Sequence, residues 1–294
     1  MSLSWLFWDP PRDAFTIPYL DLTVVWYGIL FAAGFVFGYY ILLPILSQEL
    51  KTNPHLAAKD PALHQDIPSV ASSFAERLTW FVVLGTVIGA RLGHVLFYDW
   101  PYYSTHPLEI LMIRKGGLAS HGGTLGVILA LCLFLHFAKK TFPKITFITL
   151  LDLLVIPTAM TVCFIRIANF FNQEILGYPT QQPWGIIFGH PADGSLSLPR
   201  HPVQLYEAAA YLATFVLLYL LWRCKKASIS TGTLSGLFFI CIFGSRFLLE
   251  YFKEPQSSFD GLGLQLGQTL SIPFILLGIL LVGKSKKEWL CSRK

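Results

Sequence analysis

Seven apolar runs constrain this chain more than any other feature of its sequence. A helix needs about 20 residues to cross roughly 30 Å of hydrocarbon. Charged residues make up 13% of the 294, which is about half of the ~25% usual in a soluble domain. We therefore expect an all-α polytopic membrane protein. The expected spans lie near residues 20–46, 79–99, 118–138, 146–171, 205–222, 232–252 and 268–283.

The segments between the spans predict one integral membrane domain over residues 1–294. The proline-containing segment 47–78 is expected to be a cytoplasmic loop of mixed structure. The longest segment on the opposite side, 172–204, is expected to form an extracytoplasmic head or lid. The N-terminus lacks the basic region and cleavage site of a signal peptide. Trp5 and Trp8 there suit the headgroup layer.

Lys and Arg fall unevenly on the two sides of the expected membrane, and cytoplasmic loops carry the excess of these residues. We therefore place the N-terminus outside and the C-terminus in the cytoplasm. The basic excess reflects topology, and no nucleic-acid partner is expected. One side holds Lys51, Lys59, Arg77, Lys139, Lys140, Lys144, Arg223, Lys225, Lys226, Lys284, Lys286, Lys287, Arg293 and Lys294, and the other holds Arg12, Arg114, Lys115, Arg200 and Lys253.

In this orientation, five spans bring polar side chains to one outer depth. Ionisable groups inside a membrane are costly and usually mark a functional site. We therefore expect a site near the outer face. Its candidate residues are Tyr27, Arg91, His94, Tyr98, Ser120 to Gly123, Arg166, Asn169, Arg246 and Glu250.

Two arginines in these spans have a polar neighbour on the same helical face. Arg166 and Asn169 are three residues apart, and Arg246 and Glu250 are four apart. A guanidinium fork binds phosphate through two hydrogen bonds and stays charged when buried. The two arginines are therefore candidates for holding a phosphodiester headgroup. The alternative is that Arg246 and Glu250 only neutralise each other.

The segment Ser120-His121-Gly122-Gly123 begins a span with an imidazole and bare backbone. Glycines permit close approach of a ligand, and the free N–H groups at a helix N-terminus suit an anion. Histidine can also move a proton near neutral pH. The alternative is a glycine turn with a hydrogen-bonded histidine. We interpret His94 as structural.

Three further polar residues have structural alternatives. Tyr27 follows Trp26, as an aromatic belt residue would. Gln204 and Glu207 share a face at the start of a span, where they could cap the helix or anchor it at the interface. The five cysteines have no metal or redox spacing, and no metal site is expected.

Several motifs together resemble those of the prolipoprotein diacylglyceryl transferases. The resemblance covers about residues 20–283. It rests on Arg166-x-x-Asn169-Phe-x-Asn172-x-Glu174-x-x-Gly177, Ser120-x-His121-Gly122-Gly123, Arg200-His-Pro-x-Gln-Leu-Tyr-Glu207 and Arg246-Phe-x-x-Glu250, in the family's order. Three positions depart from the family pattern: Ile165 stands for Gly, Val203 for Ser, and Lys253-Glu-Pro-Gln256 for Arg-x-Pro-Asp.

The resemblance implies transfer of a diacylglyceryl group from phosphatidylglycerol to the lipobox cysteine of a prolipoprotein in the bacterial inner membrane. No cofactor is implied. The implied catalytic residues are His121, Arg166, Arg246 and Glu250. The implied lipid-binding residues are Tyr27, Gly122, Gly123, Arg166, Asn169, Glu174, Gly177 and Arg246.

Two other classes of function compete with this one. A transporter of an anionic solute would place polar groups at the midplane and often contains a repeat. Here the polar groups stop at the outer level and no repeat is evident. A haem anchor could use His94, His121 and His136, but His136 lies at the opposite end of its span.

Overall fold

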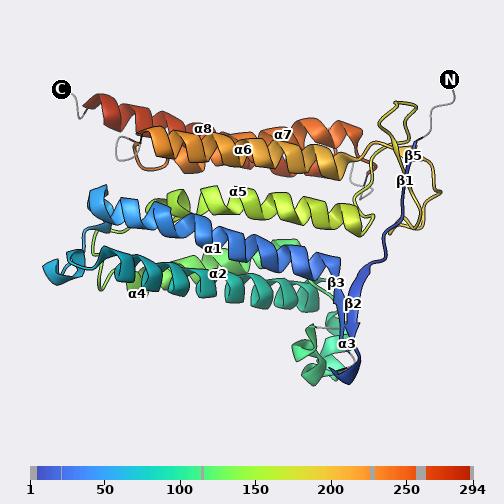
Figure 1. Ribbon diagram of the computed structural model, residues 1–294, viewed down its shortest axis with the longest axis horizontal. Coiled ribbons are helices and arrows are strands. Elements are labelled where there is room, and N and C mark those ends of the chain that lie inside the picture. Colours follow the sequence, from blue (N-terminus) through green and yellow to red (C-terminus); the bar gives the residue numbers. More distant parts are fainter. Residues whose placement is uncertain (1–4, 21, 114–115, 226–228, 256–262, 292–294) are drawn as a thin grey trace. The chain divides into compact units, whose positions relative to one another are not determined.

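Seven helices in the described part of the chain are long and apolar enough to cross a membrane. The computed structural model describes residues 5–20, 22–113, 116–225, 229–255 and 263–291 (Figure 1). The prediction of an all-α multi-pass membrane protein is therefore confirmed. The helices are α1 (Trp26–Thr52), α2 (Ile67–Phe97), α4 (Ser120–Ala138), α5 (Phe147–Phe171), α6 (Val203–Lys225), α7 (Thr233–Leu249) and α8 (Leu266–Cys291).

Shorter elements fill the connections between these helices. Strands β2 (Asp13–Ile17) and β3 (Leu22–Val25) form an antiparallel pair. The remaining short helices are η1 (Pro18–Leu20), η2 (Pro54–Leu56), η3 (Pro61–His64), α3 (Trp100–Thr105), η4 (Pro107–Leu111) and η7 (Glu250–Phe252).

The first two spans differ from the prediction at their ends. The first was expected from residue 20, but β3 occupies the chain up to Val25 and α1 begins at Trp26. Helix α1 continues to Thr52, and α2 begins at Ile67, where Asp66 accepts a hydrogen bond from the Ser69 amide at 3.3 Å. The expected loop 47–78 is therefore helical at both ends. The reason is burial of apolar residues such as Leu50 and Phe74, which hydropathy averaged over a span does not detect.

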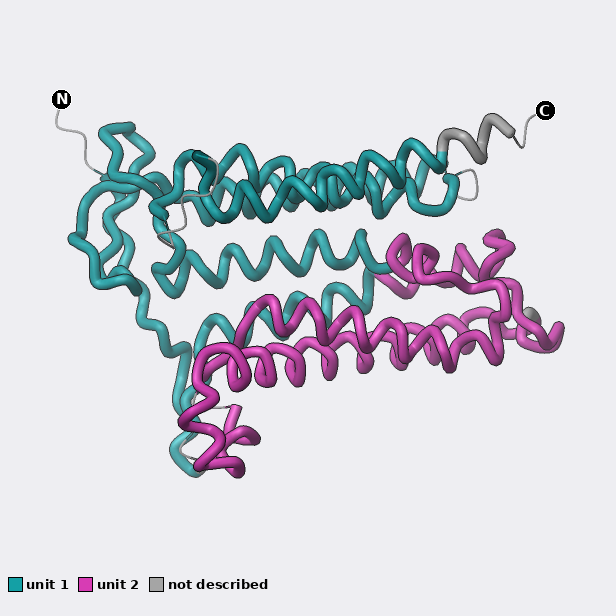
Figure 2. Tube along the Cα trace, turned by 180° about the vertical axis from the view of Figure 1, so that it is seen from behind, with its two compact units in different colours: residues 1–41, 154–294 teal, residues 42–153 magenta. Residues whose placement is uncertain are grey.

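The chain forms two compact units (Figure 2). Unit 1 contains residues 1–41 and 154–294, and unit 2 contains residues 42–153. Helices α1 and α5 therefore contribute to both units. We describe each unit by itself.

In unit 2, α2 and α4 pack through a stripe of small residues. Gly85, Gly89 and Gly93 on α2 face Gly122 and Gly126 on α4. A Cβ atom at any of these positions would overlap backbone atoms of the other helix. Small residues four apart let membrane helices approach closely, so that van der Waals packing can hold them together.

In unit 1, α6 packs on α7 and α7 packs on α8 (Figure 1). The backbones of α7 and α8 approach at Gly236 and Gly278, where either Cβ would crowd the other carbonyl. Near this contact, the rings of Phe243 and Phe274 stack with centroids 4.3 Å apart. Helix α7 ends at Leu249, and its last turn carries the candidate site residue Arg246.

The predicted head segment, 172–204, folds around a three-stranded sheet. Strand β1 (Leu6–Trp8) pairs in parallel with β4 (Ile186–Phe188), and β4 pairs antiparallel with β5 (Pro199–Arg200). The head has a small apolar core of its own, which also includes the end of α5. Its members are Phe170, Leu176, Ile186 and Phe188, with Trp8 and Leu205 packed against them.

The glycine stripe yields a stability prediction. Gly126→Ala should destabilise the protein by about 1–3 kcal/mol, the usual cost of overpacking, because its Cβ would overlap the Gly85 carbonyl. Thermal unfolding in detergent measures the effect. Gly283→Ala in α8 is the matched control, since nothing lies within 4 Å of its added Cβ. Equal unfolding temperatures for the two variants would contradict the packing argument.

Candidate active site

The last turns of α5 carry the first part of a polar cluster in unit 1. Arg166 Nη1 donates to Asn169 Oδ1 at 3.0 Å, so the two side chains share one face of the helix. Asn169 Nδ2 then donates to Glu174 Oε1 at 2.8 Å. Asn172 Nδ2 donates to the same oxygen at 3.3 Å. The polar residues of the motif that runs from Arg166 to Glu174 are thus joined by direct hydrogen bonds.

The backbone around Glu174 adopts an unusual conformation. Gln173 and Ile175 have φ angles of 54° and 60°, which non-glycine residues rarely adopt. Such residues cost of order 1–3 kcal/mol each and persist only where surrounding contacts hold them. The Glu174 amide donates to the Asn169 carbonyl at 3.1 Å. Strain of this kind clusters at functional sites, and the sequence carried no signal of it.

Glu207, in the second turn of α6, is the centre of the cluster. Its side chain is completely buried. Arg166 Nε lies 3.1 Å from Glu207 Oε2, and Lys253 Nζ donates to Glu207 Oε1 at 2.8 Å. The sequence placed Glu207 near the outer interface but did not predict this pairing. On the same helix, Gln204 Nε2 donates to the Glu174 carbonyl at 2.7 Å.

Lys253 connects Glu207 to a second carboxylate. Its Nζ also donates to Glu250 Oε2 at 3.1 Å, and the residue is only 4% exposed. Lys253 stands where the family pattern has Arg. The Lys253 ammonium does not bind one carboxylate through two hydrogen bonds. It lies between two carboxylates and donates to each.

Arg246, in the last turn of α7, differs from the other cations of this cluster. Its Nε is buried and has no hydrogen-bond partner among the described residues. The alternative of mutual neutralisation is not what the contacts show, because Glu250 pairs with Lys253. Tyr211 belongs to the same cluster, because its hydroxyl donates to Glu207 Oε1 at 3.5 Å and the Arg166 guanidinium lies 5.9 Å from its ring centroid. A buried donor without an acceptor is a candidate contact for an anion.

Tyr27 and Gly177 also belong to unit 1. Tyr27, in the first turn of α1, lies within electrostatic range of Arg166 and Glu174. Gly177 pairs with Lys253 in an isolated β-bridge. Its carbonyl accepts a hydrogen bond from Arg200 Nη1 at 3.2 Å. A Cβ at Gly177 would overlap the His201 carbonyl, so this crossing requires glycine.

His121, Gly122 and Gly123 lie in the first turn of α4, in unit 2. The exposed His121 ring packs near the rings of Phe97 and Tyr98, with centroids 5.5 and 5.7 Å away. Gly122 packs against the backbone of α2, while a Cβ at Gly123 would meet only ordinary contacts. Their predicted roles in substrate binding and proton transfer stay predictions.

Arg91 in unit 2 has a structural role. It is 3% exposed, and its guanidinium donates to the carbonyls of Glu109 and Gly116 at 2.7 Å and of Ile110 at 2.8 Å. These bonds fasten the connection before α4. His94, interpreted as structural, packs near Tyr98 with ring centroids 5.8 Å apart.

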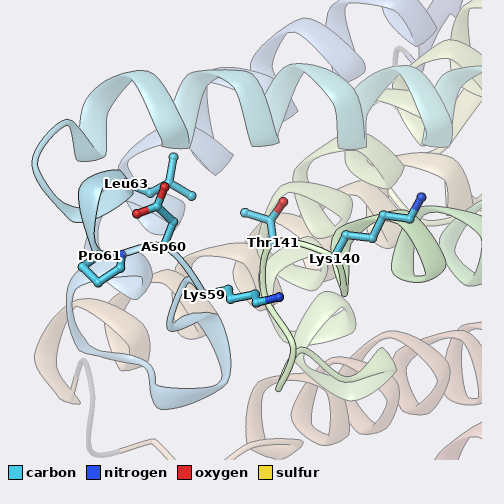
Figure 3. A pocket seen from close by; sticks show the side chains of 6 residues that line it. All are labelled: Lys59, Asp60, Pro61, Leu63, Lys140 and Thr141. Atoms are coloured by element: carbon cyan, nitrogen blue, oxygen red, sulfur yellow. The ribbon is translucent and has the colours of Figure 1, made fainter.

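A pocket of about 410 Å³ lies elsewhere in unit 2 (Figure 3). It is formed by the 53–66 connection and the segment that follows α4. Its lining residues are Lys59, Asp60, Pro61, Leu63, Lys140 and Thr141. None of the predicted site residues is among them.

No three His, Cys, Asp or Glu side chains within the described ranges lie together as a metal site would need.

The fold and the unit 1 cluster define a class: a multi-pass membrane protein with a cluster of arginines and carboxylates at its helix ends. A family model described as prolipoprotein diacylglyceryl transferase matches residues 13–283. The chain belongs to this family.

Curated relatives match nearly the whole chain. A protein of Tolumonas auensis is 44% identical, over 96% of this chain and 98% of the relative. One of Protochlamydia amoebophila is 42% identical, over 98% and 96%. One of Chlamydia pneumoniae is 36% identical, over 95% of each. All three are named phosphatidylglycerol–prolipoprotein diacylglyceryl transferase.

The pairing of Lys253 with two carboxylates yields a second prediction. Lys253→Met should destabilise the protein by about 3–5 kcal/mol, because it leaves Glu207 and Glu250 buried with less compensating charge. Lys253→Arg keeps the charge and is the matched control. Thermal unfolding in detergent compares them. A Met variant as stable as wild type would show that the pairing contributes nothing to stability.

Proposed function

We propose that this protein transfers the diacylglyceryl group of phosphatidylglycerol to the cysteine thiol of a prolipoprotein. The thiolate sulfur attacks the glyceryl carbon that bears the phosphate oxygen. The carbon–oxygen bond breaks, and its electron pair leaves with glycerol phosphate. The thiol proton passes to a base. The product is a thioether, and the reaction is the first step of lipoprotein maturation.

The observation that carries this proposal is the family membership over nearly the whole chain. The family model covers residues 13–283, and relatives of that name are 35–44% identical. The alternative of an anion transporter has no support from these relatives. The contacts in unit 1 add a reason why a phosphate would bind there.

The charges of the cluster leave Arg246 available for that phosphate. Arg166 and Lys253 are held by Glu207 and Glu250, so two cations meet two carboxylates. Glu174 accepts hydrogen bonds from neutral amides. Arg246 keeps a buried, unpartnered Nε among the described residues. A phosphate oxygen would satisfy this donor, and the charge would stabilise the leaving group as it departs.

We assign Arg166 to the same lipid phosphate through its remaining donors. Its Nε faces Glu207 and its Nη1 donates to Asn169, so Nη2 is the nitrogen that we assign to the phosphate. Asn169 and Tyr27 would orient the headgroup or the glycerol. Glu174 and Gly177 would shape the entrance beneath the 172–204 head.

His121 is our first candidate for accepting the thiol proton, and the Arg246–Glu250 pair is the alternative. An imidazole takes up a proton near neutral pH, and thiolate formation precedes attack. The assignment rests on the Ser120 to Gly123 motif and on the exposure of the ring.

We infer from the excess of Lys and Arg on one side that the N-terminus lies outside and the C-terminus in the cytoplasm. The site would then face the outer side of the bacterial inner membrane. A lipobox cysteine behind a signal peptide emerges on that side, where the lipid phosphate also lies. The substrate peptide would therefore meet the lipid at one depth.

The two arginines predict different outcomes. Arg246→Ala should lower transfer by about 10²–10³-fold, as loss of a transition-state donor does, while thermal stability is kept because Arg246 has no ionic partner among the described residues. Arg166→Ala should abolish transfer and also reduce stability, because Glu207 loses a cation. The assay follows mass gain of a lipobox peptide in phosphatidylglycerol vesicles.

A lysine variant at position 166 sharpens this test. Arg166→Lys should rescue transfer only in part, since a point charge cannot fork. Near-normal transfer by Arg166→Ala or Arg246→Ala would exclude the phosphate role of that residue. Absence of any diacylglyceryl adduct with folded wild-type protein would overturn the proposed function.

His121 has a test of its own. His121→Gln should abolish transfer without changing thermal stability, because the exposed ring makes only aromatic contacts among the described residues. The same peptide assay measures it. His106→Gln is the matched control, as another exposed histidine of unit 2. A His121→Gln variant that keeps its activity would remove the residue as the base.

A further inference from the structure

The N-terminal strand β1 is bonded directly to the end of α5. Trp8 Nε1 donates to the Phe170 carbonyl at 3.2 Å, and the two rings stack with centroids 4.6 Å apart. The Gly189 amide donates to the Trp8 carbonyl at 3.0 Å. The strand therefore places the next residue, Asp9, beside the turn that follows α5.

Asp9 is bound by two side chains from the head segment. Its Oδ1 accepts hydrogen bonds from Gln173 Nε2 at 3.1 Å and from His190 Nδ1 at 2.6 Å. The bond from His190, and then that from Gln173, lowers the pKa of Asp9 below its ordinary value. Asp9 is therefore an ionised acceptor at neutral pH. A Cβ at Gly189 would collide with its carboxylate, so the site is closely fitted.

Every polar group of Gln173, in the side chain and in the backbone, makes a hydrogen bond. It is 2% exposed. Its Oε1 accepts from the His190 amide at 2.7 Å, and its carbonyl accepts from the Ala192 amide at 3.0 Å. Its φ angle of 54° requires such contacts, because the left-handed region is unfavourable for a residue with a Cβ. Asp9 supplies the acceptor for its amide nitrogen.

Gln173, which these contacts restrain, lies directly before Glu174 in the chain. The Glu174 carboxylate accepts from Asn169, and Asn169 in turn accepts from Arg166. A continuous series of contacts thus runs from Asp9 through Gln173 and Glu174 to Arg166. Asp9 itself precedes residues 13–283, which the family model matches.

We propose that Asp9 is a positioning residue for the transfer reaction, which holds Gln173 and so sets Glu174 and Asn169 against Arg166. This inference rests on the proposed function. Asp9 touches neither reacting atom. Its effect is on the geometry of the Arg166 guanidinium, and small displacements of catalytic groups can cost up to about 100-fold in rate.

Three variants test the inference in the vesicle assay. Asp9→Ala removes the acceptor and should lower kcat by about tenfold or more with little change in KM for the lipid. Asp9→Asn keeps an oxygen for Gln173 and should retain most activity. His190→Ala is the matched control, because it removes the pair with Asp9 but keeps the Asp9–Gln173 bond. Wild-type kcat in Asp9→Ala, or an equal loss in His190→Ala, would overturn the proposal.

Hydrogen exchange supplies a readout that does not depend on activity. The Gln173 and Glu174 amides donate to the carbonyls of Phe170 and Asn169 at 3.1 Å. Both amides should exchange faster in Asp9→Ala and stay protected in His190→Ala. If wild-type protein transfers nothing, the proposed function fails, and protection of these amides alone decides whether Asp9 positions Glu174. Unchanged exchange in Asp9→Ala would refute that positioning.

Discussion

The carboxylate of Glu207 is completely buried between the guanidinium of Arg166 and the ammonium of Lys253. Taking these charges out of water is costly, and the cost is offset only when each charge keeps a well-placed partner. The arrangement therefore ties α5, α6 and the segment after α7 to one another. A displacement of any of them would leave a buried charge without compensation.

The need to compensate the charge of Glu207 accounts for the close contacts around Gly177, which hold Lys253 in place. Lys253 reaches Glu207 from a segment that pairs with Gly177 through a β-bridge. Gly177 in turn passes so close to His201 that a Cβ would not fit. Arg200 binds the Gly177 carbonyl and pairs with Glu254 at 2.6 Å. The polypeptide crossings near Gly177 thus hold the lysine that compensates the buried carboxylate.

The seven spans could be predicted from sequence because each one is encoded locally, as a run of apolar residues. The Arg166–Asn169 contact could be predicted for the same reason, since it follows from helical spacing. The pairing of Arg166 with Glu207 could not, because the residues are far apart in the chain and nothing local sets their approach. The glycine stripe from Gly85 to Gly93 is also encoded locally, as glycines four residues apart on one helix. The left-handed backbone at Gln173 had no local signal, because the side chain of this residue is bonded to Asp9, which is far away in the chain.

Lys253 determines which cation of the cluster has no carboxylate partner among the described residues. A guanidinium forks onto a single carboxylate, whereas an ammonium can lie between two carboxylates that face different directions. Lys253 does this with Glu207 and Glu250. Glu250 is thereby paired with Lys253, and the buried Nε of Arg246 has no hydrogen-bond partner among the described residues. The cations of the cluster are thus separated by their contacts, because Arg166 and Lys253 pair with carboxylates whereas Arg246 Nε has no partner among the described residues. In this chain the departure from the family's arginine is consistent with that separation, because a single ammonium is enough to hold both acids.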